Sequence, residues 1–125
     1  MSQIYLLQLA SQQAKWLSAR QTMIAGNIAN ANTPGYRAMD IQPFTAVLDK
    51  TNITMASTNP AHMAPEGDDF AAARTAESDS WDATLSGNSV SLEQEMMKEG
   101  DLNRSYTLNT NVKRAFHQMI MSVLK

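Results

Sequence analysis

The side chains best suited to chemistry in this 125-residue chain are two histidines and one short acidic cluster. His62 lies between Pro60 and Pro65 in a polar stretch, and His117 follows Phe116 within a helical pattern. A histidine-based metal site on a helix needs a second ligand three or four residues away, and His117 has none. We therefore interpret both histidines as solvated or interface side chains.

The acidic cluster of Glu66, Asp68 and Asp69 has the right oxygen chemistry for calcium, but its spacing does not match an EF-hand loop. Glycine-rich phosphate loops and nucleophile-elbow motifs are absent from the sequence. The chain also lacks cysteine, which excludes disulfides and thiolate chemistry. The sequence predicts no catalytic site, no metal site and no cofactor.

The composition favours one helical domain with no nucleic-acid partner. Charged residues make up 18% of the chain and the net charge is −2, so no basic field exists for a phosphate backbone. Nine methionines and few aromatic residues suit helix packing better than an aromatic β core. The apolar run Ile4–Leu7 is too short for a signal-peptide core or a membrane span. We expect a chain that stays in the cytoplasm or leaves it without a cleaved signal.

The first long element is a helix predicted over residues 4–31, about 42 Å long at 1.5 Å per residue. Alternating steps of three and four define a narrow stripe, like that of a coiled coil, in which seven of eight residues are apolar. The stripe contains Leu7, Ala10, Ala14, Leu17, Gln21, Ile24, Ile28 and Ala31. A second helix is needed to cover it.

The second long element is a helix predicted over residues 92–125. Ser91 and Gln94 have the spacing of a capping box at its start. Gly100 costs about 1 kcal/mol relative to alanine and predicts a weak point or bend. The apolar stripe of this helix contains Leu102, Val112, Phe116, Met119 and Val123, and is interrupted by Ser105 and Asn109.

The segment between these helices differs in composition. Residues 49–91 hold seven acidic and two basic side chains, with prolines, glycines and few large aliphatic residues. We expect a loop-rich, partly extended segment with a short hairpin near 51–56. The predicted fold is mainly α: two long terminal helices form an elongated antiparallel, coiled-coil-like hairpin. Its three parts are residues 1–36, 37–90 and 91–125.

The end of the first helix carries the most specific motif in the chain. Asparagine is unfavourable inside a helix, and Pro34 cannot continue one. Gly35 after Pro34 suits the second central position of a type II turn, where φ is positive. We expect the helix to end at a defined corner. The corner motif contains Asn27, Asn30, Asn32, Thr33, Pro34, Gly35 and Tyr36.

The segment Gln21–Tyr36 resembles the N-terminal signature of bacterial flagellar axial proteins, the rod, hook and hook-associated subunits. Residues 37–40 with Phe44 and Leu48, and residues 87–96 followed by Asn103, Tyr106 and Phe116, are similar to the short proximal rod subunits of that family. The resemblance covers roughly residues 15–48 and 86–125.

The resemblance implies a structural subunit and not an enzyme. It implies export through the flagellar type III apparatus and helical assembly into the drive shaft that transmits torque in the periplasm. The implied partners are other rod subunits, the rod-to-ring adaptor and the membrane ring proteins, in a large helical hetero-oligomer. The residues expected to pack the axial helices are Leu7, Leu17, Ile24, Ile28, Val112, Phe116, Met119 and Val123.

Two alternatives remain open at this point. One is another short rod component, the second proximal rod subunit. The other is a small helical-bundle adaptor or binding module, in which the two stripes would form an ordinary intramolecular core. The residue pattern alone favours intramolecular and intermolecular packing about equally. The resemblance favours intermolecular packing.

Overall fold

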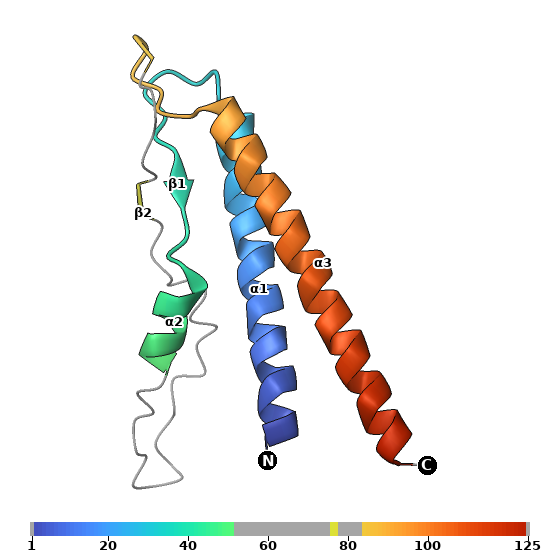
Figure 1. Ribbon diagram of the computed structural model, residues 1–125. Coiled ribbons are helices and arrows are strands. Elements are labelled where there is room, and N and C mark those ends of the chain that lie inside the picture. The colour runs from blue at the N-terminus through green and yellow to red at the C-terminus, as the bar shows by residue number, and fades with distance from the viewer. Residues whose placement is uncertain (1, 52–75, 78–83, 125) are drawn as a thin grey trace, which may run out of the picture.

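A computed structural model describes residues 2–51, 76–77 and 84–124, and its fold is mainly helical (Figure 1). Helix α1 spans Ser2–Ala29 and helix α3 spans Leu92–Val123. The two helices contact each other and run in opposite directions, so both chain termini lie at one end of the elongated molecule. The prediction of two long terminal helices is confirmed.

Helix α1 ends two residues earlier than predicted, at Ala29. The Asn30 side chain donates from Nδ2 to the Gly26 carbonyl at 2.8 Å, and its backbone N–H donates to the same oxygen at 3.2 Å. Thr33 N–H then donates to the Asn30 carbonyl at 3.0 Å and closes a turn. Asparagine ends the helix because its side chain competes for helical carbonyls.

Helix α3 begins after Ser91, but the predicted capping box is wrong in one respect. Ser91 is the N-cap with extended backbone angles, yet its side chain makes no capping hydrogen bond. The helix then runs unbroken through Gly100, where a weak point was expected. Gly100 is exposed, and a Cβ placed there would meet nothing within 4 Å, so its missing side chain leaves no void inside the protein.

The middle of the chain contains three short elements that the sequence did not predict. Helix α2 spans Phe44–Thr51, and strand β1, Met39–Asp40, pairs antiparallel with strand β2, Ala76–Glu77. The hairpin expected near 51–56 lies, beyond Thr51, outside the described residues. We call residues 37–51 the arm. It runs beside α1 (Figure 1) and also contacts α3, where Lys98 lies 3.5 Å from Asp40.

The hydrophobic core joins three parts of the chain and is not a simple two-helix seam. Trp16 packs on Phe44 of the arm with ring centroids 6.0 Å apart, and its Nε1 donates to the Gln42 carbonyl at 2.9 Å. The contact between the two long helices does not by itself bury Trp16, and the arm covers it. The buried core residues are Trp16, Leu17, Ile24, Ile41, Val47 and Leu102.

Burial along α3 does not follow its hydrophobicity. Its buried residues are Glu95, Leu102 and Asn109, each seven apart and so on one side of the helix. Asn109, which interrupts the apolar stripe, donates from Nδ2 to the Ala10 carbonyl at 3.0 Å. The apolar residues that continue the stripe toward the C-terminus are exposed: Val112 by 43%, Met119 by 62% and Val123 by 83%.

Candidate functional site: a polar junction between helices and arm

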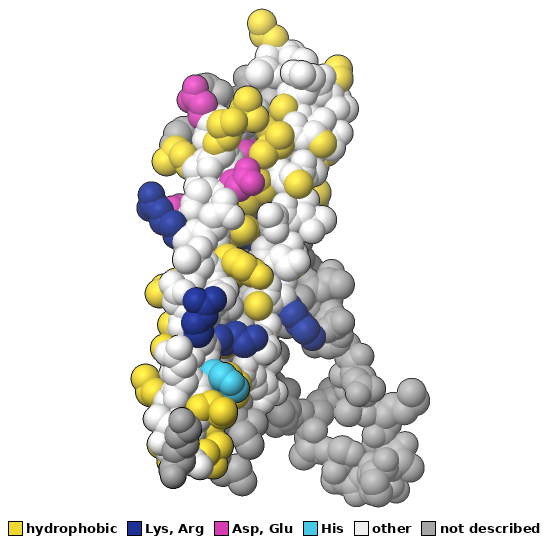
Figure 2. Space-filling model, turned by 90° about the vertical axis from the view of Figure 1, so that its right-hand side faces the viewer, with side chains coloured by type: hydrophobic (Ala, Val, Ile, Leu, Met, Phe, Trp, Pro, Cys, Tyr) yellow, Lys and Arg dark blue, Asp and Glu magenta, His cyan; other side chains and the backbone are white. Residues whose placement is uncertain are grey.

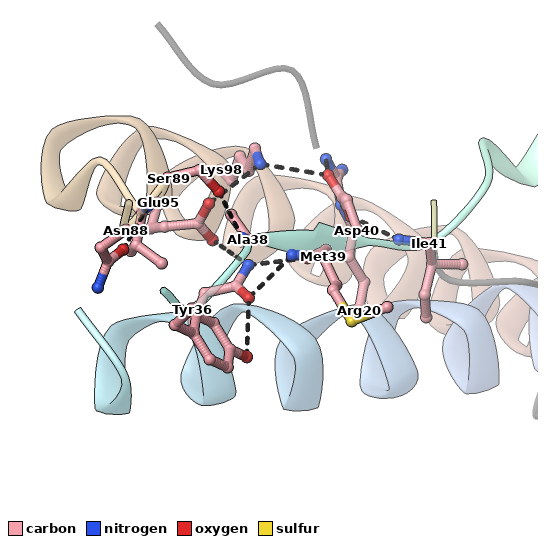
Figure 3. A network of polar contacts seen from close by, with 12 residues as sticks. Arg20, Tyr36, Ala38, Met39, Asp40, Ile41, Asn88, Ser89, Glu95 and Lys98 are labelled. Carbon is pink, nitrogen blue, oxygen red and sulfur yellow. Dashed lines mark hydrogen bonds and ion pairs between the residues drawn. The ribbon is translucent and has the colours of Figure 1, made fainter. Parts of the chain in front are cut away.

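A buried polar cluster lies where α1, the arm and α3 meet (Figure 3). Asn27 is 1% exposed and is hydrogen-bonded to both the arm and α3. Its Oδ1 accepts the Met39 N–H at 3.1 Å, and its Nδ2 donates to the Met39 carbonyl at 2.8 Å. These two bonds to one backbone unit define which way the amide points. The same Nδ2 donates to Glu95 Oε2 at 3.1 Å, while Tyr36 donates its hydroxyl to Oδ1 at 3.4 Å.

Four charges of alternating sign extend this cluster across the three parts of the chain. Lys98 Nζ lies 3.1 Å from Glu95 Oε1 and 3.5 Å from Asp40 Oδ2. Arg20 holds Asp40 in a two-pronged pair, Nε to Oδ1 and Nη2 to Oδ2, both at 3.1 Å. We call these four residues, with Asn27 and Asn88, the polar junction. Its charges sum to zero, so the buried Glu95 carboxylate is compensated.

The protonation of Asp40 is determined by competition between burial and its partners. Burial opposes ionisation of the carboxyl. The hydrogen bond and the charge of Arg20, the Ile41 N–H and the charge of Lys98 together outweigh burial and lower the pKa of Asp40 below its ordinary value of 3.8. Asp40 is therefore ionised throughout the neutral range.

This lowered pKa predicts a loss of stability in acid. The folded protein binds the Asp40 proton less readily than the unfolded chain, so the stabilisation is present above pH 3.8 and is lost as pH falls through the folded pKa. Asp40→Asn should lower the free energy of unfolding at pH 7. The variant should also lose less of that free energy than the wild type as the pH falls, as measured by urea unfolding at several pH values. Asp101→Asn is the control, because Asp101 is exposed and lies 3.9 Å from Arg104. An equal effect of both variants would contradict the prediction.

Asn88 binds the backbone of the corner through its side-chain amide. Its side chain is buried, and Nδ2 reaches the carbonyls of Asn30, Ala31 and Thr33 at 2.8–2.9 Å. Its Oδ1 accepts the Val90 N–H at 2.8 Å. These carbonyls lie beyond the end of α1, in the corner, and Asn88 donates to them from a segment that leads into α3.

Two glycine turns meet at the corner. Gly35 has φ 74°, and Tyr36 N–H donates to the Thr33 carbonyl at 3.3 Å, as expected of the predicted Pro-Gly turn. Gly87 has φ 77°, and a Cβ on it would lie 3.7 Å from the Gly35 Cα. Gly35 N–H donates to the Ser86 carbonyl at 3.0 Å. The two turns are therefore in direct contact and joined by a backbone hydrogen bond.

A matched pair of glycine variants tests this corner. Gly35→Ala should destabilise the protein by about 1 kcal/mol, because a positive φ is unfavourable for a residue with a Cβ. Gly26→Ala is the control: it lies inside α1, where an added Cβ would meet nothing within 4 Å, and alanine there should stabilise by up to about 1 kcal/mol. Thermal unfolding followed by circular dichroism compares them, and two shifts of the same sign would refute the turn's role.

The predicted corner motif divides between two environments. Asn27 is buried inside α1, and Asn30 and Tyr36 are half-buried. The remaining four residues form the exposed outside of the corner: Asn32, Thr33, Pro34 and Gly35. Asn27 thus belongs to the polar junction and is a packing residue of the helix as well as part of the motif.

The residues expected to pack the axial helices also divide. Leu17 and Ile24 are in the core, and Ile28 packs against it. Leu7 and Phe116 are half-buried, whereas Val112, Met119 and Val123 are exposed. His117 is exposed on α3. His62 and the cluster of Glu66, Asp68 and Asp69 lie outside the described residues.

Sequence reasoning did not identify Arg20, Asp40, Asn88, Glu95 and Lys98 as interacting residues. One signal was present: Glu95, Leu102 and Asn109 follow a seven-residue spacing, which places two polar residues in a helix seam. The contacts of Asn88 with the corner and of Asn27 with Glu95 span 55–68 residues of the chain, too far for spacing to reveal.

The described residues offer no arrangement for chemistry. Within residues 2–51, 76–77 and 84–124, no group of three histidine, cysteine or acidic side chains is placed to hold a metal ion. Every buried side-chain nitrogen or oxygen in that same part of the chain has a hydrogen-bond partner. None of its helices combines the length and apolar character needed to cross a membrane. The polar junction joins the arm to both long helices.

Comparison with known proteins shows the family of the chain. Residues 9–37, which contain most of α1 and the corner, match the family model described as flagella basal body rod protein. Over 129 aligned positions the chain is 43% identical to the flagellar basal body rod protein FlgB of Agrobacterium fabrum (strain C58 / ATCC 33970). This alignment covers 100% of the chain and 96% of the relative. The chain belongs to the FlgB family of flagellar basal body rod proteins.

Proposed function

We propose that this chain is a structural subunit of the proximal rod, in which α1 and α3 form a coiled-coil-like hairpin that assembles helically with neighbouring subunits. Membership of a structural rod family supports this role and provides no reason to expect a reaction. The observation that carries the proposal is the exposed C-terminal half of α3. Its apolar residues need cover that α1 does not provide.

The polar junction gives the subunit a way to transmit torque. An arm joined to the helices only by a flexible linker would yield when the rod is turned. Here Asn27 and Asp40 tie strand β1 to both long helices through hydrogen bonds and ion pairs. We infer that the arm turns with the helices as one body, so that contacts made by the arm carry load into the axial layer.

The partners follow from the place of this family in the basal body. Assembly with other basal body components is a property of rod proteins. We propose that the neighbours are other rod subunits, the rod-to-ring adaptor and the membrane ring proteins, in the periplasm. We also propose export through the flagellar type III apparatus without a cleaved signal. The three parts of the chain, residues 1–36, 37–90 and 91–125, would then be an axial helix, a subunit-specific segment and a second axial helix.

Isolated basal bodies test this function directly. Cells that express an epitope-tagged chain as their only copy should swim, and the tag should appear by electron microscopy at the rod, close to the membrane ring. Deletion of the gene should abolish swimming, and the untagged wild-type chain should restore it. Swimming of the deletion strain, or a tag found only in the cytoplasm, would contradict the proposed function.

A further inference from the structure

Helix α3 has two exposed apolar flanks in addition to the side that contacts α1. Residues separated by steps of three and four lie on one side of a helix, and two such sets flank the line through Glu95, Leu102 and Asn109. Flank A contains Leu92, Met96, Tyr106, Met121 and Leu124, and flank B contains Met97, Leu108, Val112 and Met119. Their side chains are between 43% and 76% exposed.

The fourth side of α3, opposite α1, is polar, and the charged residues Glu93 and Arg104 on it lie in the N-terminal half of the helix. This side presents Gly100, Thr107, Asn111, Gln118 and Ser122, and all five are exposed. The exposed hydrophobic side chains therefore do not surround the helix at random. They form two separate surfaces, as a helix needs if it has one neighbour on each side and solvent in front.

Charges are distributed unequally between the halves of α3. Residues 92–109 hold four carboxylates and two cations, while residues 110–124 hold Lys113, Arg114 and His117 and no carboxylate. In the space-filling view, acidic side chains lie on the upper part of this face and cations and histidine lie lower (Figure 2). Complementary charge would therefore favour contact between the C-terminal half of one α3 and the N-terminal half of another.

The charges also differ between the flanks. Lys113 follows Tyr106 by seven residues and so lies in line with flank A. Asp101 lies four residues after Met97 and seven before Leu108, in line with flank B. Asp101 and Lys113 are both exposed, and the neighbour of Asp101 is Arg104 in a long 3.9 Å pair. Glu99, seven residues before Tyr106, also lies in line with flank A, but an offset that brings Lys113 beside Asp101 carries Glu99 beyond the start of the neighbouring helix. The cation on flank A and the carboxylate on flank B therefore favour pairing of unlike flanks.

We propose that flank A of one copy packs against flank B of a second copy, with the two α3 helices parallel and offset by the distance from Asp101 to Lys113. That offset is about 18 Å at 1.5 Å per residue. Contact between two different surfaces leaves one of each free, and with an axial offset it produces an open helical array. The inference rests on the proposed rod function and names the surface that the subunit uses.

The absence of cysteine makes this contact testable by cross-linking in isolated basal bodies. Met97→Cys lies on flank B, and Thr110→Cys lies in line with flank A, four residues after Tyr106. With a short bis-maleimide reagent, the double variant should give cross-linked dimers and larger species of this chain. Each single variant should give no cross-linked dimer of this chain. Met97→Cys combined with Thr107→Cys is the matched control, because Thr107 lies on the polar side.

The outcomes separate the two proposals. Cross-linked dimers from Thr110→Cys alone would show pairing of like flanks and overturn the inference. Cross-links that join this chain only to a different protein, and never to a second copy, would also overturn it. A double variant present in basal bodies without cross-links would also overturn it and leave the rod function standing. Absence of the wild-type chain from basal bodies would instead contradict the rod function.

Charge reversal supplies a second measurement that does not depend on cysteine variants. Lys113→Glu and Asp101→Lys should each reduce swimming in soft agar, because each places like charges across the contact. The double reversal Lys113→Glu with Asp101→Lys should restore most of the lost swimming. Failure of the double variant to exceed both single variants would overturn the A-to-B pairing.

Discussion

Asn27→Asp should unfold the polar junction, with a loss of about 3–5 kcal/mol in the free energy of unfolding. The substitution changes almost no volume, yet it replaces a donor with a charged acceptor. The new carboxylate would face Glu95 Oε2, which the amide nitrogen approaches to 3.1 Å, and the Met39 carbonyl, which it approaches to 2.8 Å. Both contacts turn from attraction to repulsion, and Asn27 is 1% exposed, so water cannot relieve them.

Urea unfolding and amide hydrogen exchange measure this effect. The Met39 N–H, which donates to Asn27 Oδ1, should lose protection before the middle of α1 does. Asn32→Asp is the matched control, because it makes the same chemical change at an exposed position of the corner. Glu95→Gln in the same chain as Asn27→Asp should recover part of the loss, since the glutamine amide can donate to the carboxylate. A stable Asn27→Asp variant would show that the junction does not hold the arm.

Ile24→Pro should abolish swimming while the protein is still produced. Proline in a helix interior costs about 3 kcal/mol or more, because it removes a hydrogen bond and its ring clashes with the preceding turn. Ile24 is 2% exposed and belongs to the core, so the substitution also removes buried apolar surface. Most domains have about 5–15 kcal/mol of stability in total, which such a loss largely removes.

Ile24→Val controls for the side chain alone. It keeps the helix and should cost about 0.5–1.5 kcal/mol, with swimming retained. Soft-agar motility and immunoblotting of whole cells compare the two variants in a strain that lacks the wild-type gene. A motile Ile24→Pro strain with normal protein level would show that α1 is not a continuous helix in the working rod.

The long helices were predictable because their signals are local. Ile24 and Leu17 recur with the spacing of a helix face, and both are buried. The positive φ of Gly35 follows from the Pro-Gly pair alone, because such a turn needs a residue without a Cβ. The early end of α1 at Ala29 was missed by two residues, since the competition between the Asn30 side chain and the helix depends on geometry.

The arm was not predictable in the same way. Helix α2 is eight residues long, and strands β1 and β2 have two residues each, lengths at which local pattern carries little information. Phe44 marks the start of α2 only because Trp16, 28 residues earlier, offers a ring to pack against. Tertiary contact, and not intrinsic propensity, places these elements.

The sequence by itself determined two long helices, a corner with a left-handed glycine, the absence of cysteine chemistry and the resemblance to axial proteins. All of these depend on residue types and on residues that are neighbours in the chain. Only the tertiary structure decided that Glu95 and Asn109 are buried while Met119 and Val123 are exposed. A polar residue can be buried only where partners satisfy it, and the partners of Glu95 are Lys98 on the same helix and Asn27, 68 residues away. The exposed end of α3 has no such cover within the described chain, which is the physical reason to look for it in a second copy.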